Sequence, residues 1–213
     1  MKEFSVSHGQ ERLNVSIISS PAEEVLAAAY IAAKADGTLS TFFPEGVPCL
    51  SDFLALSRDE NRRNYACLVT RPDGRGLDVA GLGLLTIGHC GDMFTKADAS
   101  ILYQRKYQKP WFSIPASRAM LEVAFEEVPG LKAIFGTTPS PNRAAIYHAM
   151  RLGFERSAEL PCYTIWRGFP SPAVILSLER TRFYGAKQEG KADRKKDSAR
   201  TNGALQGALA IFS

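Results

Sequence analysis

The sequence predicts a single domain of the α/β (α+β) class, built on a mixed β-sheet. Predicted strands and helices alternate through the middle of the chain, whereas pairs of adjacent strands occur at both of its ends. The chain has 213 residues, 45% of them hydrophobic, which is enough to fill one core of ordinary size. Pattern and size therefore agree on one compact domain.

Composition narrows the classes of protein that fit the chain. No apolar run approaches the ~18 residues of a membrane span, and the first twelve residues lack an apolar signal core. We therefore expect no membrane partner and a cytoplasmic location. The cysteines form no CxxC pair and no metal-ligand spacing with the three histidines, which predicts reduced thiols and no metal site; they are Cys49, Cys67, Cys90 and Cys162.

Most of the net charge of +4 lies near the C-terminus. Residues 185–200 contain six basic and three acidic residues, while the rest of the chain is nearly neutral. The folded part thus has no nucleic-acid signature, and the basic segment predicts a weak electrostatic contact at most. We divide the chain into a folded domain, residues 1–184, and a basic, low-complexity tail, residues 185–213.

The end of that tail allows two interpretations. Leu205, Leu209 and Phe212 would share one face of a short helix, which is the spacing of a peptide that docks in a groove of a protein partner. Two glycines in the same stretch favour disorder instead. Both interpretations stay open.

The N-terminal half begins with a β-branched stretch, residues 13–19, which predicts a strand. Ser20 follows as a helix N-cap, with Pro at the first helical position and acids in the first turn, so a helix should run to about Lys34. Ser51–Asp52 predicts the cap of a second, short helix that continues through residue 56.

A β-hairpin is predicted next, with strands at residues 65–70 and 78–87 and a turn at residues 72–76. The second strand contains Gly81 and Gly83. Because no helix follows them directly, we interpret these glycines as a bulge or a close backbone contact and not as a phosphate loop.

The C-terminal half alternates strand and helix. A strand is predicted at residues 99–107, a helix from Pro115 to the breaker Pro129–Gly130, and a strand at residues 131–137. Two further strands close the domain, near residues 162–166 and 173–178.

Between these strands lies a short helix with a distinct signal at each end. Asn142 stands where an N-cap belongs, and Gly153 suits the left-handed position after the last turn. Phe154 can then pack back on the helix. A capped helix explains each residue separately, but not the order of the surrounding elements.

The order of elements and this helix together resemble the GNAT superfamily of N-acetyltransferases over roughly residues 13–180. The residues that carry the resemblance are 131–137, Asn142, Ala145–Ile146 and Leu152-Gly153-Phe154. The resemblance implies a mostly antiparallel sheet with helices on both faces. It also implies that the strands at 99–107 and 131–137 splay apart, and that acetyl-CoA lies between them and donates its acetyl group to a primary amine of a small molecule or a protein.

In that family, backbone N–H groups at the start of the helix after the first splayed strand hold the cofactor's pyrophosphate. The resemblance places this loop at residues 109–117, where Ser113 and Pro115 replace two glycines. Basic side chains and hydroxyls would then substitute for glycine amides. The residues implied to bind the cofactor are Arg105, Lys109, Ser113, Ser117 and Asn142. The alternative is a helix that starts at a proline, beside solvated lysines.

The resemblance assigns no catalytic residue. Many family members have a Tyr that protonates the leaving thiolate, and Ala149 occupies that position here. Tyr147 and His148 lie on other faces of the helix, and we interpret His148 as a surface or partly packed histidine.

A general base is missing as well, because the predicted strand at 99–107 contains no carboxylate. Asp92 and Asp98 precede it, and Glu122, Glu126 and Glu127 follow in the next helix. Two hypotheses result. The chain is an N-acetyltransferase whose acceptor pocket is formed by the helices around residues 30–53. Alternatively it is a non-catalytic structural or assembly protein, because some virion and head-assembly proteins of tailed phages look like eroded members of this superfamily.

Overall fold

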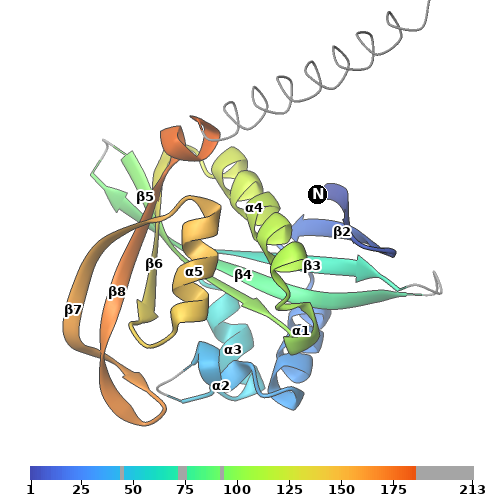
Figure 1. Ribbon diagram of the computed structural model, residues 1–213, viewed down its shortest axis with the longest axis horizontal. Helices are drawn as coiled ribbons and strands as arrows, with labels where there is room; N and C mark the ends of the chain where they lie inside the picture. Colours follow the sequence, from blue (N-terminus) through green and yellow to red (C-terminus); the bar gives the residue numbers. More distant parts are fainter. Residues whose placement is uncertain (44–45, 72–75, 92–93, 186–213) are drawn as a thin grey trace, which may run out of the picture.

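The computed structural model describes residues 1–43, 46–71, 76–91 and 94–185 (Figure 1). In chain order its elements are β1 (Lys2–His8), β2 (Glu11–Ser19), α1 (Glu23–Ala35), α2 (Leu39–Phe42), α3 (Leu50–Ser57), β3 (Arg62–Thr70), β4 (Leu77–Cys90), β5 (Phe94–Tyr103), the 3₁₀ turn η1 (Arg105–Tyr107), α4 (Pro110–Glu127), β6 (Leu131–Pro139), α5 (Arg143–Leu152), β7 (Glu155–Trp166) and β8 (Phe169–Glu179).

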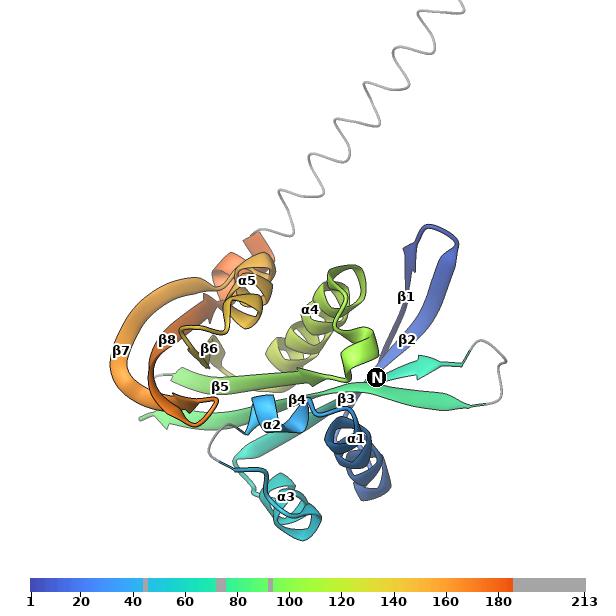
Figure 2. The same ribbon diagram turned by 60° about the horizontal axis from the view of Figure 1, so that its bottom comes forward.

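The described strands form one sheet in the order β1-β2-β3-β4-β5-β6-β8-β7. Every strand pair among them is antiparallel except β5 with β6. Figure 2 shows α4 and α5 on one face of this sheet and α1, α2 and α3 on the other. The predicted α/β (α+β) class, the mostly antiparallel sheet and the helices on both faces are confirmed.

Each face of the sheet has its own hydrophobic core. The core under α4 and α5 contains Tyr65, Ala97 and Phe125, together with Val6 from β1. The core under α1 and α3 contains Leu26, Phe53 and other apolar residues. Alternate residues along β3, β4 and β5 point to opposite cores, as a pleated strand requires. Ala66, Leu82 and Leu102, which are paired across the three strands, therefore face α1 and α3.

The first hairpin was not predicted, because β1 is short and polar residues separate its apolar ones. β1 pairs antiparallel with β2 and buries Val6 against the α4 core. The predicted strand at residues 13–19 is confirmed within β2. An edge strand needs only one apolar face, and two apolar residues are a weak signal for one.

Two helix caps differ from the prediction. Ser20 has a φ of 48° and does not cap α1, because Ala22 is the N-cap residue and the helix starts at Glu23. α3 likewise begins after Cys49 instead of being capped at Ser51–Asp52. The two helices themselves are confirmed, whereas α2 was not predicted. At Ser20, the local cap preference was outweighed by the path that the chain takes out of β2.

The glycines in β4 mark a bulge and a close contact, as the sequence indicates. The register between β3 and β4 shifts by one residue beside Gly81. A Cβ atom at Gly81 would lie 2.5 Å from the backbone oxygen of Leu102 and 2.5 Å from the Tyr103 ring. Since real Cβ atoms do not approach other atoms so closely, only glycine lets β4 pass Tyr103 at this distance.

The strand before α4 and the start of α4 differ from the prediction. β5 covers residues 94–103 instead of 99–107, because residues 105–107 form η1. α4 begins at Pro110, and Pro115 lies inside it instead of starting it. Proline suits the first helical turn, where its missing N–H has no intrahelical partner, and Pro110 takes that role. The predicted phosphate loop at residues 109–117 is therefore mostly helical.

α5 matches the prediction at both ends. The Asn142 side chain accepts a hydrogen bond of 3.2 Å from the backbone N–H of Ala145. Gly153 has a φ of 101°, and the backbone N–H of Phe154 donates to the carbonyl of Ala149 at 3.1 Å. Phe154 is buried. These contacts satisfy backbone groups that a helix end leaves unpaired.

Several predictions lie outside the described residues. They include the turn at residues 72–75, Asp92, and the tail from residue 186 onward with its docking face of Leu205, Leu209 and Phe212. The division of the chain into residues 1–184 and 185–213 stays a prediction.

Candidate active site at the fork between β5 and β6

The centre of the sheet contains a fork. β5 and β6 pair only from Thr95 to Asp98 on one strand and from Leu131 to Phe135 on the other. β5 continues to Tyr103 and β6 to Pro139, and these ends are paired only with β4 and β8, on their far sides. The predicted splay of the two central strands is confirmed. Backbone N–H and C=O groups that face each other across the fork need partners other than the opposite strand.

A buried polar cluster lies on the side of the fork that α4 and α5 cover. The Ser117 hydroxyl lies 2.9 Å from the Tyr103 hydroxyl and 2.9 Å from Nε2 of His148. Ser113 Oγ lies 3.5 Å from Nδ1 of the same imidazole. Ser117 is fully buried and Ser113 is 2% exposed. One hydrogen-bonded chain thus joins β5, α4 and α5, and we call Tyr103, Ser113, Ser117 and His148 the polar cluster.

The direction of these hydrogen bonds follows from burial. If Tyr103 donates to Ser117 and Ser117 donates to Nε2 of His148, the hydroxyl protons of Tyr103 and Ser117 both have acceptors. The reverse direction would leave the Tyr103 proton without a partner in a buried place. We infer that His148 is neutral and carries its proton on Nδ1. Burial lowers the pKa of His148 and raises that of Tyr103, which favours the neutral form of both.

His148 has a larger role than the sequence indicates. The prediction of a surface or partly packed residue is right for its partial burial, yet the ring also joins α5 to α4 through Ser117. Its helical position alone cannot reveal a partner that lies 31 residues away. Tyr147 is exposed, and Ala149 packs against the core.

The residues predicted to bind the cofactor fall into two groups. Ser113 and Ser117 are enclosed and engaged with His148, so a phosphate would reach them only if the imidazole moved. Arg105 and Lys109 are exposed near the start of α4. Asn142 caps α5 with its side chain. The structure brings Ser113 and Ser117 together around His148, but it does not bring all five residues to one site.

Other groups around η1 are already engaged. Lys106 pairs with Asp78 at 2.7 Å, and Arg71 pairs with the other oxygen of the same carboxylate at 2.8 Å. Hydrogen bonds from Lys106 and Arg71 lower the pKa of Asp78 to about 2. The backbone N–H of Arg105 donates to Asp36 at 2.6 Å. η1 is thereby held to β4 and to the end of α1.

The first turn of α4 fits a phosphate only in part. Pro110 has no N–H, and the N–H groups of Phe112 and Ser113 both donate to the carbonyl of Lys109 at 2.9 Å. The backbone therefore offers few donors to an anion here, unlike a glycine-rich turn. The exposed charges of Arg105 and Lys109 are the stronger feature of this end.

The opposite side of the fork is open. Arg62 of β3, Thr86 of β4 and Asp98 of β5 are in register and lie in one row across the sheet, on the face that α1 and α3 cover. Thr86 and Asp98 are exposed, as is Ser100 in the next row. The helices leave this part of the face uncovered.

In the sequence analysis Asp98 was placed before the strand, and the structure shows that this prediction was wrong. It lies in the middle of β5 and forms the last pair with β6, so its carboxylate stands where the fork begins. Among the described residues it forms no ion pair. The actual start of β5 at Phe94 is what the strand prediction missed, and polar residues between Phe94 and Ala99 are the reason.

Tyr65 contributes a second unusual group under α4. Its hydroxyl is buried without a hydrogen-bond partner among the described residues, and burial raises its pKa. A cavity of about 10 Å³, roughly the space of one water molecule, is bounded by Tyr65, Ile101, Met120 and neighbouring residues.

Features that would indicate other classes of protein are not found in the described part of the chain. It has no group of His, Cys, Asp or Glu that suits a metal ion, and its cysteines form no disulfide. Burial raises the pKa of the Cys67 thiol to about 12. None of the described helices has the length and apolar character to cross a bilayer. A cytoplasmic or virion location stays a prediction.

A mixed sheet with a fork at its single parallel pair defines the class of fold found in acyl-CoA-dependent N-acetyltransferases. Comparison with solved structures identifies it as the GNAT fold. A spermidine N-acetyltransferase from Vibrio cholerae in complex with CoA and spermine has a TM-score of 0.63 and 14% identity, covering 80% of this chain and 98% of that one. Neither the protein-family models nor the curated proteins include a match to the sequence.

Two more structures extend this likeness across distant organisms. A GNAT-family acetyltransferase from Bacillus anthracis has a TM-score of 0.59 and 14% identity, over 83% of this chain and 98% of that one. Arabidopsis thaliana NAA60, in complex with a bisubstrate analogue, has a TM-score of 0.58 and 14% identity, over 77% and 99%. At such identities the likeness establishes the fold and not the activity.

Proposed function

We propose that this protein is an N-acetyltransferase that transfers an acetyl group from acetyl-CoA to a primary amine. The observation that carries the proposal is the fork, with the carboxylate of Asp98 at the point where β5 and β6 separate. The fork offers backbone donors and acceptors to the amide groups of the cofactor, and Asp98 lies on the side from which an amine can approach.

In this proposal acetyl-CoA supplies a thioester carbonyl as the electrophile. Asp98 attracts the ammonium form of the acceptor and accepts a proton from it, which frees the nitrogen lone pair for attack. The new C–N bond replaces the C–S bond, and the nitrogen releases its second proton to solvent. The thiolate takes its proton from solvent, because Ala149 has none to give. Holding amine and thioester together provides much of the rate.

The residues predicted to bind the cofactor differ in how accessible they are to it. Arg105 and Lys109 are free to meet phosphate charge beside η1, and Asn142 lies at the start of the helix that borders the fork. Ser113 and Ser117 become available if the His148 ring turns away from them. We therefore expect cofactor binding to be coupled to opening of the polar cluster.

A second candidate function is favoured by the polar cluster itself. A hydrogen-bonded chain from β5 to α5 closes one side of the fork, and the usual tyrosine is absent. Both observations suit a non-catalytic GNAT-fold protein with a structural or assembly role, of the kind seen in phage virions.

Acetyl-CoA binding separates the two candidates. The purified chain would be titrated with acetyl-CoA and followed by calorimetry and thermal unfolding, with desulfo-CoA as the matched ligand. A cofactor at a hundred times its dissociation constant stabilises the native state by about 2.7 kcal/mol. Binding followed by acetylation of an amine panel supports the enzyme. No thermal shift at millimolar acetyl-CoA refutes it and favours the non-catalytic protein.

A further inference from the structure

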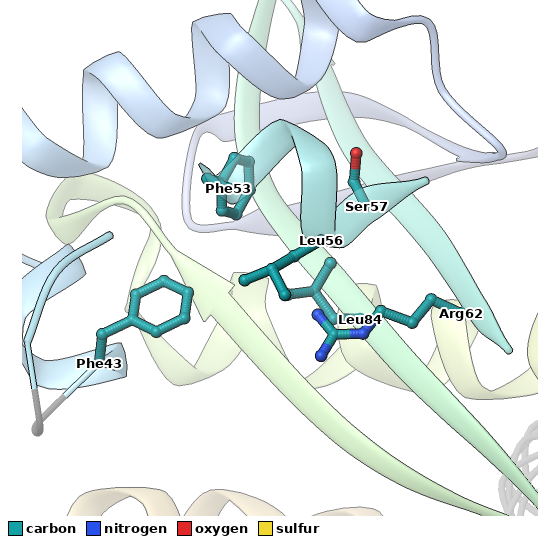
Figure 3. Close-up of a pocket in the computed structure, with 6 residues that line it drawn as sticks. All are labelled: Phe43, Phe53, Leu56, Ser57, Arg62 and Leu84. Atoms are coloured by element: carbon teal, nitrogen blue, oxygen red, sulfur yellow. The ribbon is translucent and has the colours of Figure 1, made fainter. Parts of the chain in front are cut away.

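A shallow pocket opens on the sheet face that α1 and α3 cover. Figure 3 shows its lining, which comes from the end of α2, from α3, and from β3 and β4: Phe43, Phe53, Leu56, Ser57, Arg62 and Leu84. It contains about 200 Å³ of space free of protein atoms, open solvent included. Four of the six lining side chains are apolar.

Arg62 is the charged group of this pocket. Its Nε is buried and has no hydrogen-bond partner within the described chain. In Figure 3 its guanidinium extends past Leu84 toward the space between Leu56 and Phe43. A buried donor without a partner is costly, and a guanidinium is best satisfied by a carboxylate, which can accept two of its N–H groups at once. The pocket thus combines apolar walls with a buried cationic donor that an anion would satisfy.

The position of Arg62 relates the pocket to the fork. Arg62 pairs with Thr86, and Thr86 pairs with Asp98, so the cation and the carboxylate lie two strands apart on one face. At the usual spacing of neighbouring strands, their Cα atoms are separated by about 10 Å. The uncovered row between them ends at a positive group on one side and a negative group on the other.

We propose that Arg62 binds the carboxylate of the acceptor, and that the acceptor is an amino acid with an apolar side chain. This inference rests on the proposed acetyl transfer and specifies its substrate class. The carboxylate pairs with Arg62, the side chain packs against Phe43 and Leu56, and the ammonium group points along the row toward Asp98. The two opposite charges of an amino acid lie on one carbon, so the reach of the Arg62 and Asp98 side chains must close the distance between their strands.

The same arrangement argues against a polyamine as acceptor. Spermidine has amines and no carboxylate, so it would leave the Arg62 guanidinium unpaired and place further positive charge beside it. The Vibrio cholerae structure contains spermine, and the pocket of this chain calls for a different chemistry.

Binding without the cofactor tests the inference separately from catalysis. Phenylalanine, phenylalanine amide and spermidine would be titrated against the full chain, observed by ligand-detected NMR. We expect phenylalanine to bind at least tenfold more tightly than its amide, because a hydrogen bond to a charged group is lost in the amide. Equal affinities for phenylalanine and its amide, or tighter binding of spermidine, would overturn the inference.

Two arginine variants provide the matched comparison. R62Q should lower the affinity for phenylalanine at least tenfold and leave the affinity for the amide unchanged. R63Q is the control, since Arg63 is the exposed neighbour of Arg62 and its guanidinium donates to backbone carbonyls of Glu60 and Arg62. An equal loss in both variants would contradict a specific role for Arg62.

The proposed function can fail without the inference failing. If phenylalanine binds in an Arg62-dependent way and is never acetylated, the binding site at Arg62 is supported and the proposed acetyltransferase function is refuted. If amines without a carboxylate are acetylated equally well by wild type and R62Q, the transferase stands and this assignment of the acceptor is wrong.

Discussion

The fork is closed by hydrogen-bonded side chains on one face of the sheet and is open on the other. On the α4 and α5 side, a chain of buried hydrogen bonds runs from Tyr103 through Ser117 to His148. On the α1 and α3 side, Arg62, Thr86 and Asp98 form a row that the helices leave open. The residues of the polar cluster on the first face satisfy one another, whereas Arg62 on the second face has a buried donor without a partner among the described residues. Satisfied polar groups hold a structure together, and unsatisfied ones indicate where a ligand belongs.

The largest expected effect concerns the open face. Asp98→Asn should lower kcat/KM for the best amine by about 100-fold or more, because a positioned general base contributes 10²–10⁴. Steady-state kinetics at saturating acetyl-CoA would measure it. Glu126→Gln, which changes an exposed acid on α4, should keep wild-type activity. Activity within threefold of wild type in Asp98→Asn would remove Asp98 from the proposed mechanism.

The next effect concerns the strand that positions Tyr103. Gly81→Ala should reduce the free energy of unfolding by about 1–3 kcal/mol, because the new methyl group overlaps the Tyr103 ring and the backbone of β5. Urea denaturation would measure the loss. Gly88→Ala, in the same strand, meets only the flexible Lys96 side chain at 3.5 Å and should change stability by less than about 0.5 kcal/mol.

The polar cluster makes a prediction about pH. His148 has a folded-state pKa below its ordinary value of 6.5, so the unfolded chain binds the proton more readily. Its contribution to stability is complete above pH 6.5 and is lost as the pH falls from there toward the folded-state pKa, by at most about 1.4 kcal/mol per pH unit. Urea unfolding at pH 7.5 and 5.5 would show this loss. A His148→Gln variant with the same pH slope as wild type would contradict it.

The smallest expected effect concerns Tyr65. Its buried hydroxyl has no partner among the described protein atoms, so Tyr65→Phe should leave the free energy of unfolding unchanged or raise it by up to about 1 kcal/mol. Thermal and urea unfolding would measure the change. A loss of more than 1 kcal/mol would mean that the hydroxyl has a strong partner, such as an ordered water molecule.

The sequence predicts most of the fold because its strongest signals are local. Asn142 and Gly153 bound α5 through contacts within a few residues, and the structure confirms both. Ser20 carries an equally good local signal, yet the chain leaves β2 with Ser20 in a left-handed conformation and the cap is not formed. Local preference decides an element's end only where tertiary contacts do not oppose it.

The candidate site was harder to predict because its residues meet only through the fold. Ser117 and His148 come together by helix packing, and Arg62 and Asp98 share a row through strand register. The spacing of these residues along the chain predicts neither the contact of Ser117 with His148 nor the shared row of Arg62 and Asp98. The resemblance predicted the fork, whereas Asp98 was missed because the polar start of β5 looks like a loop.

The brief seam of parallel pairing at the base of the fork has a mechanical consequence. Among the described strands, it is the only pairing between two parts of the sheet. One part runs from β1 to β5 with α4 packed on it, and the other contains β6, β7 and β8 with α5 packed on β8. Away from this seam, the two parts are joined by the contact between α4 and α5 and by Arg180 and Phe183, which contact Phe125 of α4. A ligand bound in the fork would contact both parts, so it should slow amide hydrogen exchange on both sides of the seam.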